Sequence, residues 1–474
     1  MIAQIKTHWL ILSVLALAVV LRLININQSV WLDEAINIMA VKNYDVGFLI
    51  TDYSIGDLHP PLYHLLLKNW TQIFGYSEIA VRLLSVVFGT ISVFLIYSLG
   101  QLIFDKKTAL ISAFLLAISG LHIYYSQEAR MYALAAMLVL FSMTGFVQIL
   151  GRFSDKLFAW VFYIVSTVLV LYADYLPYFL FATYNLYVVF NKASLGKKWL
   201  LAWCLSQAVI VLSLLPWLSV FVKQLSTGLQ AAQNVPEWGQ VVGAASLKAL
   251  ALVPLKFIIG RVTIDDKIIY TILAASVILV CSFISIRTLR DWPKTKLLWY
   301  WLVIPALLAY LVAFWIPIFT YFRFLFVLPA FILLISKGIS MFPQKAQTIL
   351  TVTTTAIFFV SSLFYLATPR FWRENWRDAV SYVKGAQVDR SAVVFVTDYQ
   401  TAPYQYYGAP VTYYGPVGWQ NRDFDQIFLM RYVQPIFDPQ DKLRQNIEKA
   451  DYSKVEEVDF NGVTIWRYVK VRKL

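Results

Sequence analysis

Charged residues are scarce in this chain, and their scarcity limits what kind of protein it is. Only 14% of the 474 residues are Asp, Glu, Lys or Arg, whereas soluble domains carry roughly 25%. Hydrophobic residues make up 59%, and the mean hydropathy is +0.63. A soluble chain would have to bury all of these apolar runs in one core, which its length does not favour. The composition therefore predicts a protein of the lipid bilayer.

Cysteine is nearly absent as well. The sequence has two, Cys204 and Cys281, and both lie inside apolar runs. This placement argues against a disulfide framework and against a cysteine-based metal cluster.

Acidic charge is in deficit, since the formal net charge is +13. A basic total suggests nucleic acid only where the charges form a patch. Here the Lys and Arg residues lie in short breaks between apolar runs, and these breaks alternate with others poorer in Lys and Arg, as the positive-inside rule requires. We therefore expect membrane lipids as partners, and no nucleic acid. The basic breaks include 106–107, 152–156, 192–198, 287–296 and 337–345.

Apolar runs of membrane length predict a polytopic α-helical membrane protein with about eleven transmembrane helices. No small-residue cleavage site follows the first run, so we expect an uncleaved span there. With the basic breaks in the cytoplasm, the N-terminus is cytoplasmic and everything after about residue 367 is extracytoplasmic. The expected location is the plasma (inner) membrane. The expected span cores are 8–25, 80–104, 108–123, 132–150, 157–173, 176–191, 199–221, 268–286, 297–314, 321–336 and 346–366.

Residues 1–366 form the predicted transmembrane domain, and its first outward loop, 26–79, is long. Apolar residues at helical spacing predict two helices along the membrane interface in this loop, Asp33–Val41 and Leu62–Phe74. A second outward segment, 222–267, contains an apolar stretch, 244–260, interrupted by lysine and proline, which predicts an interfacial or re-entrant helix. The alternative is that this stretch spans the membrane, which would place the tail in the cytoplasm. Long loops of this kind usually carry function.

The tail, 367–474, changes character because charged residues return. A small extracytoplasmic α/β domain is expected here. Two tryptophans one helical turn apart, Trp372 and Trp376, favour interfacial anchoring at its start. The predicted elements are a helix over Trp376–Lys384 and strands over Ala392–Thr397, Gln426–Tyr432 and Val463–Val471.

Asp33 and Glu34 follow the first span directly, in an otherwise apolar and aromatic peptide. Desolvation there would make a carboxylate a stronger base. The alternative is structural: Asp33 as the N-cap of a helix and Glu34 as a favourable first-turn residue. Adjacent residues on a helix do not face one another, so one acid as base and the other as positioning group is the better hypothesis.

The same loop contains Asp57, His59 and His64 around a Pro-Pro corner. We interpret His59 as a donor to an anionic group, and the alternative is a hydrogen bond within the loop. The spacing matches no standard zinc motif, so the sequence leaves a divalent metal open and predicts no certain cofactor.

Further polar candidates lead into the fourth span. Ionisable groups at membrane depth are functional candidates because unpaired burial costs several kcal/mol. Glu128, Arg130 and Tyr132 form the first group, with a closed structural network as the alternative. Arg261 and Arg323 flank later spans, where an arginine can hold phosphate bidentately or snorkel to lipid headgroups.

Five short motifs, in order along the chain, together resemble the dolichyl-phosphate-mannose protein mannosyltransferase-like family, which includes bacterial relatives similar to the aminoarabinose transferase of lipid A. The motifs are Trp31-Leu32-Asp33-Glu34-Ala35, His59-Pro60-Pro61-Leu62-Tyr63, Ser126-Gln127-Glu128-Ala129-Arg130-Met131-Tyr132, the stretch Arg323 to Pro329, and Asn375-Trp376-Arg377-Asp378-Ala379.

The resemblance implies a GT-C glycosyltransferase fold with a cavity at the outer leaflet, a donor sugar on polyprenyl phosphate, and inversion at the anomeric carbon. Asp33 matches the family acid that deprotonates or positions the acceptor, and Glu34 matches its neighbour. His59 stands before Pro-Pro, where the aminoarabinose-transferase branch tends to have a lysine that contacts the donor phosphate.

We therefore expect an inverting glycosyltransferase that moves a hexosyl or pentosyl group to an acceptor lipid, glycan or protein. A transporter or flippase of lipid-linked sugars and a non-catalytic membrane scaffold are the alternatives. A transporter would place its ionisable groups near the midplane, whereas here they gather at outward ends. The site hypothesis names Asp33 and Glu34 as catalytic, His59, Arg130, Arg261 and Arg323 as phosphate-binding, and Asp57, His64, Glu128 and Tyr132 as further pocket residues.

Overall fold

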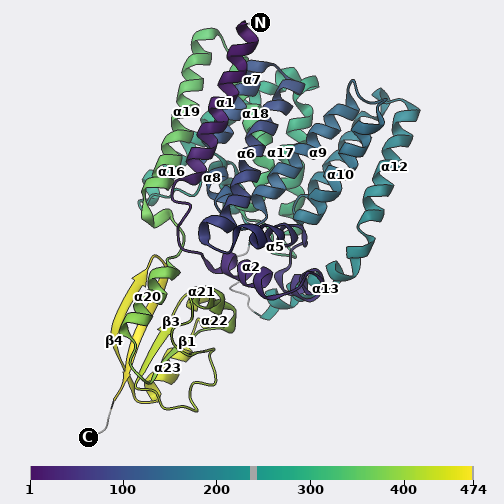
Figure 1. The fold of residues 1–474 in the computed structure, drawn as a ribbon. Helices are drawn as coiled ribbons and strands as arrows, with labels where there is room; N and C mark the ends of the chain where they lie inside the picture. Colours follow the sequence, from purple (N-terminus) through teal and green to yellow (C-terminus); the bar gives the residue numbers. More distant parts are fainter. Residues whose placement is uncertain (1, 235–242, 472–474) are drawn as a thin grey trace.

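A bundle of helices makes up most of the molecule, and a small sheet domain hangs from one end of it (Figure 1). The computed structural model describes residues 2–234 and 243–471, so part of the expected outward segment 222–267 lies outside the described residues. The chain begins at the far end of the bundle, and the sheet domain lies at the opposite end (Figure 1).

Helices occupy all eleven expected span positions. Among the described residues, five helices are long and apolar enough to cross a membrane, or up to seven if each of two bent pairs is one span. The chain is therefore a multi-pass membrane protein, and the count of about eleven spans stays a prediction. The helices are α1 (Ile2–Leu23), α6 (Glu78–Ile103), α7 (Lys106–Ala117), α8 (Gly120–Ser126), α9 (Tyr132–Leu150), α10 (Leu157–Ala173), α11 (Tyr178–Asn191), α12 (Lys197–Ser213), α16 (Lys267–Ile286), α17 (Trp292–Val312), α18 (Leu328–Ser340) and α19 (Gln344–Ala367).

Shorter helices lie across the end of the bundle that faces the sheet domain (Figure 1). The two helices predicted in the first loop are confirmed as α2 (Leu32–Asn43) and α5 (Leu62–Phe74). The connection between them is helical too, which the sequence did not predict. Further helical elements at this end are α3 (Val46–Phe48), the π-helical turn η1 (Leu49–Tyr53), α4 (Ser54–Asp57), α13 (Leu215–Asn234), α15 (Leu247–Ile259) and the 3₁₀ turn η4 (Tyr321–Val327).

The start of α2 decides between two hypotheses for the acid pair. Trp31 is the N-cap, and its backbone N–H is 3.4 Å from the Glu34 carboxylate that accepts its hydrogen bond. Asp33 therefore lies inside the first turn, and the hypothesis that it is the N-cap is wrong. The Asp33 carboxylate therefore does not cap α2.

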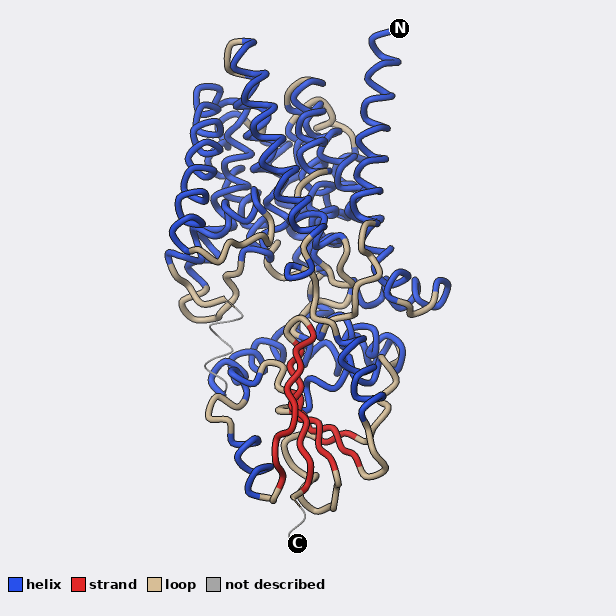
Figure 2. The backbone as a smooth tube through the Cα atoms, turned by 90° about the vertical axis from the view of Figure 1, so that its left-hand side faces the viewer, coloured by secondary structure: helices blue, strands red, loops and turns tan. Residues whose placement is uncertain are grey.

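The C-terminal domain is a five-stranded sheet of order β2-β1-β3-β5-β4 with helices packed against it (Figure 2). β1 pairs parallel with β2 and β3, and β5 pairs antiparallel with β3 and β4. The predicted helix and three strands are confirmed, and β2 and β4 are additions. The elements are α20 (Trp376–Ala386), β1 (Ser391–Phe395), α21 (Thr401–Tyr406), β2 (Tyr413–Tyr414), β3 (Gln426–Met430), α22 (Gln434–Phe437), α23 (Lys442–Lys449), β4 (Tyr452–Phe460) and β5 (Val463–Lys470).

Trp376 corrects one expectation. Its side chain is fully buried in the core of the C-terminal domain, with its ring edge-on to Tyr432 at 5.3 Å. A buried indole cannot reach lipid, so the prediction of interfacial anchoring is wrong for Trp376. Its apolar spacing reflects the packing face of α20.

The C-terminal domain docks on the first loop through polar contacts. The backbone N–H of Val30 donates to the Tyr407 hydroxyl at 2.9 Å, and the Tyr406 hydroxyl donates to the Tyr76 carbonyl at 2.9 Å. Arg377 pairs with Glu78 at 2.8 Å. The domain therefore helps to shape the same loop that carries the acid pair.

Candidate active site

Glu34 is the centre of a closed charge network. Arg82, near the start of α6, donates to both Glu34 oxygens at 2.8 and 2.5 Å. Its remaining N–H groups reach the carbonyls of Ile26, Gln28 and Ser29, so all five guanidinium donors have partners. Both side chains are fully buried. The network ties the first loop to α6.

The same carboxylate holds a second segment, because the backbone N–H of Ala129 donates to Glu34 at 2.9 Å. Burial alone would raise the pKa of Glu34, but Arg82 and Arg373 outweigh it and hold this pKa below its usual value. Glu34 is thus a buried, ionised anchor. Its geometry favours the positioning role over direct proton transfer.

Asp33 points to different partners, as expected for neighbouring residues of a helix. Its carboxylate lies 3.6 Å from the Arg130 guanidinium, and its side chain is 36% exposed while that of Arg130 is 7% exposed. An acid that is both oriented by arginine and reachable from outside can meet a substrate hydroxyl.

Asp57 sits beside this pair and gathers the two loop histidines. Its carboxylate is 3.1 Å from His59 Nδ1, 3.7 Å from His64 Nε2 and 3.9 Å from Arg130 Nη1. Burial acts to raise the pKa of Asp57, but both histidines and Arg130 hold it well below the usual range. Asp57 is therefore an anion that orients His59 and Arg130.

The two histidines have different environments. Burial lowers the pKa of His64 to about 4, although Asp57 opposes the shift. Neutral His64 is 3.0 Å from the Asn37 side-chain oxygen, to which its Nε2–H donates. His59 bonds Asp57 through Nδ1, and within the described part of the chain its Nε2 has no hydrogen-bond partner. His59 is the histidine that can serve a ligand.

Glu128 and Arg130 do not pair with each other in this structure. Glu128 is buried and lies 3.6 Å from Arg373. Burial raises the pKa of Glu128 to about 7, Glu34 adds to the shift, and Arg373 and Arg130 oppose it. One Glu128 oxygen has no hydrogen-bond partner among the described residues. The network around Glu128 is therefore incomplete.

Arg373 is a site residue that sequence reasoning missed. It comes from the segment that joins α19 to the C-terminal domain, and its side chain is 1% exposed. It lies 3.7 Å from Glu34 and donates to the Tyr124 carbonyl at 3.2 Å. Arg82 was missed too, although a lone arginine near the start of an apolar span is a signal that could have found it.

Arg261 and Arg323 are brought to the same region by aromatic residues. Arg261 lies 4.4 Å from the Tyr124 ring centre, over which Arg373 also lies at 4.5 Å. Arg323, in η4, is flanked by Phe322, whose ring packs against Tyr132 at 5.5 Å. Neither Arg261 nor Arg323 has a carboxylate within ion-pair distance among the described residues.

Asp174, in the turn after α10, is a further residue that sequence reasoning did not single out. It is buried, and burial raises its pKa while His59 and Arg323 act to lower it. His59 and Arg323 therefore each lie within electrostatic reach of Asp174.

A metal centre gains no support from the described residues, which contain no group of three or more His, Cys, Asp or Glu able to hold an ion. The Asp57 carboxylate is already shared among His59, His64 and Arg130.

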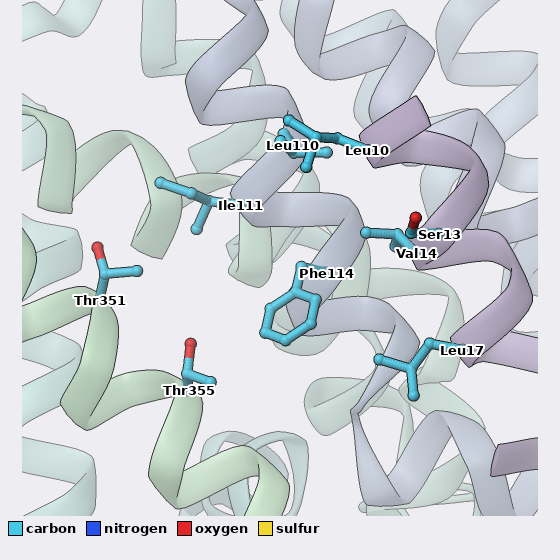
Figure 3. Close-up of a pocket in the computed structure, with 9 residues that line it drawn as sticks. All are labelled: Leu10, Ser13, Val14, Leu17, Leu110, Ile111, Phe114, Thr351 and Thr355. Carbon is cyan, nitrogen blue, oxygen red and sulfur yellow. The ribbon is translucent and has the colours of Figure 1, made fainter. Parts of the chain in front are cut away.

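An apolar cleft of about 380 Å³ lies elsewhere, between α1, α7 and α19 (Figure 3). It has no ionisable lining residue and is unsuited to acid–base chemistry. Its nine lining residues are Leu10, Ser13, Val14, Leu17, Leu110, Ile111, Phe114, Thr351 and Thr355.

Residues 58–218 match the family described as dolichyl-phosphate-mannose-protein mannosyltransferase. No curated protein matches the sequence significantly.

Several solved structures are similar over nearly the whole chain. ArnT from Cupriavidus metallidurans in the apo state has a TM-score of 0.62 at 9% identity, covering 99% of this chain and 98% of that one. The same protein bound to undecaprenyl phosphate gives 0.58 at 10%, covering 98% of each. The Archaeoglobus fulgidus oligosaccharyltransferase with Zn and sulfate gives 0.57 at 13%, covering 96% of this chain and 72% of that one. At these identities the matches show a shared fold.

Proposed function

We propose that this chain, which has the GT-C glycosyltransferase fold and matches the mannosyltransferase family over residues 58–218, is an inverting transferase that uses a polyprenyl-phosphate-linked sugar. The observation that carries the proposal is the placement of Asp33, which is 36% exposed and lies 3.6 Å from Arg130, while Arg130 also lies 3.9 Å from Asp57, the partner of His59. Two structures of the same fold were solved with undecaprenyl phosphate and with dolichol phosphate, which supports this class of donor.

Asp33 is the proposed base. It takes the proton of the acceptor hydroxyl as the acceptor oxygen bonds the anomeric carbon and the bond from that carbon to the phosphate oxygen breaks. The departing polyprenyl phosphate takes the negative charge. Because the acceptor attacks the face opposite the leaving phosphate, the configuration of the anomeric carbon is inverted. Arg130, 3.6 Å away, orients the Asp33 carboxylate.

His59, Arg261 and Arg323 are the proposed phosphate-binding residues. Arg130 is less suited than predicted, because two carboxylates already share it. Arg261 and Arg323 have no such partner among the described residues, and a guanidinium in a site of low dielectric needs an anion. The leaving phosphate supplies that charge and gains stabilisation as it departs.

The proposed sidedness places the acid site and the C-terminal domain outside the inner membrane, with the N-terminus in the cytoplasm. Contacts among the basic breaks support it. Lys107 donates to Gln347 at 2.8 Å, Arg287 donates to the Met341 carbonyl at 3.2 Å, and Lys296 bonds Asn191. These breaks therefore gather at one end, as the positive-inside rule requires.

The deciding experiment compares Asp33→Asn with Asp52→Asn, an exposed acid of the same loop, in nanodiscs supplied with labelled polyprenyl-phosphate sugar. We expect Asp33→Asn to lower transfer by about 10²- to 10⁴-fold, since it removes the base, and Asp52→Asn to match the wild type. Full activity in Asp33→Asn would contradict the assignment, and transport of the lipid without transfer would favour a flippase. Mass spectrometry of cell-envelope glycans with and without the protein identifies the sugar and acceptor.

A further inference from the structure

Gln224 is a buried polar residue on the inward face of a half-exposed helix, a face that also buries Trp217 and Val220. Its side chain is 3% exposed, while Leu218, Val222 and Leu225 of the same helix, α13, are 52%, 56% and 40% exposed. α13 follows α12 after a bend of 59° and lies across the end of the bundle (Figure 1). Burial of a single amide on such a helix requires partners.

Those partners lie in the first loop. The Gln224 amide nitrogen donates to the carbonyls of Ser54 at 2.6 Å and His59 at 3.0 Å. Its oxygen accepts from the Tyr175 hydroxyl, which in turn accepts from the Trp217 indole at 2.9 Å. One side chain thus connects α13 and the turn after α10 to both ends of the segment 54–59.

The segment held in this way is strained. Leu58 adopts a left-handed backbone conformation, with φ of 61°, which is unfavourable for a residue that has a Cβ. α13 also lies against this residue. Its Gly228 is so near that a Cβ added there would stand 3.6 Å from a Leu58 methyl group. A strained turn persists where its surroundings hold it, and α13 supplies those surroundings.

We propose that Gln224 is a positioning residue: it fixes the turn 57–59 so that the free Nε2 of His59 faces the donor phosphate. Asp57 sets the tautomer of His59 from one side, and Gln224 fixes its backbone from the other. The inference rests on the proposed function only for what His59 binds. The positioning itself is a property of the chain alone.

Hydrogen exchange tests the positioning without any substrate. Gln224→Met keeps the length of the side chain and removes both donors, and Gln230→Met is the matched control because Gln230 is exposed on the same helix. We expect amides of residues 57–59 to exchange about 10-fold faster in Gln224→Met and unchanged in Gln230→Met. Unchanged exchange in a folded Gln224→Met would overturn the proposal.

Kinetics then show whether the positioning acts through His59. Gln224→Met should raise the donor KM about 10-fold with a smaller effect on kcat, while adding it to His59→Ala should cost less than twofold more. If Gln224→Met raised the donor KM by the same factor in the wild type and in His59→Ala, its effect would not act through His59. A wild type that transfers no sugar would refute the proposed function, and the exchange measurement would still decide the role of Gln224.

Discussion

Two carboxylates on α2, those of Glu34 and Asp33, each lie near an arginine, but one pair is closed and buried and the other is open. On one side, Glu34 and Arg82 are fully buried, bonded at 2.8 and 2.5 Å, and every donor of Arg82 is used. On the other, Asp33 and Arg130 are 3.6 Å apart, and Asp33 is 36% exposed. The Glu34–Arg82 pair stabilises the fold, whereas the exposed Asp33 carboxylate can still contact a ligand. Adjacent acids in one motif therefore have separate roles.

Arg82→Met tests the closed side and should have the largest effect on folding. Removing one member of a buried pair leaves an uncompensated charge, which costs about 3–5 kcal/mol. We expect a large fall in the melting temperature in detergent. A variant that folds with normal stability would break the comparison, because Glu34 would then not need its partner.

Arg323→Ala tests a proposed ligand-binding arginine, for contrast with the buried structural arginine Arg82. Loss of a charged hydrogen bond to phosphate should lower kcat/KM for the donor by about 10- to 100-fold, while the melting temperature stays near that of the wild type. Arg290→Ala, which removes an exposed arginine from a basic break, is the control. A stability loss with unchanged kinetics would assign Arg323 to the fold.

Glu128 lies between the two sides and gives a pH dependence. Because burial raises its pKa in the folded state to about 7, the folded protein holds this proton more tightly than the unfolded chain does. Stability from Glu128 is present below its ordinary pKa of 4.5 and is lost as pH rises to about 7. Glu128→Gln should flatten that part of the curve of melting temperature against pH. An unchanged slope would show that Arg373 keeps Glu128 ionised.

Arg377→Ala should have the smallest effect. Arg377 is 41% exposed, and its pair with Glu78 lies at the boundary with the C-terminal domain. Exposed ion pairs contribute less than about 1 kcal/mol, so the melting temperature should hardly move. A fall as large as that of Arg82→Met would show that domain docking, rather than burial, dominates this end of the molecule.

Local pattern predicted much of what the structure contains. Apolar runs located the helices, and helical spacing located α5 to the residue. Composition and motifs named Asp33, Asp57, His59 and Arg130, which the structure brings together. Trp376 shows the limit of such patterns, because an amphipathic helix start has the same spacing whether it faces lipid or a domain core.

The sequence by itself determined that this protein lies in a membrane and that its acids follow the first span, because hydropathy and residue order are local properties. Only the tertiary structure decided which acid is buried. Arg82 comes from α6 and Arg373 from beyond the last helix of the bundle, and both meet Glu34 across the fold. Charge pairing depends on distance in space, and no local pattern records it.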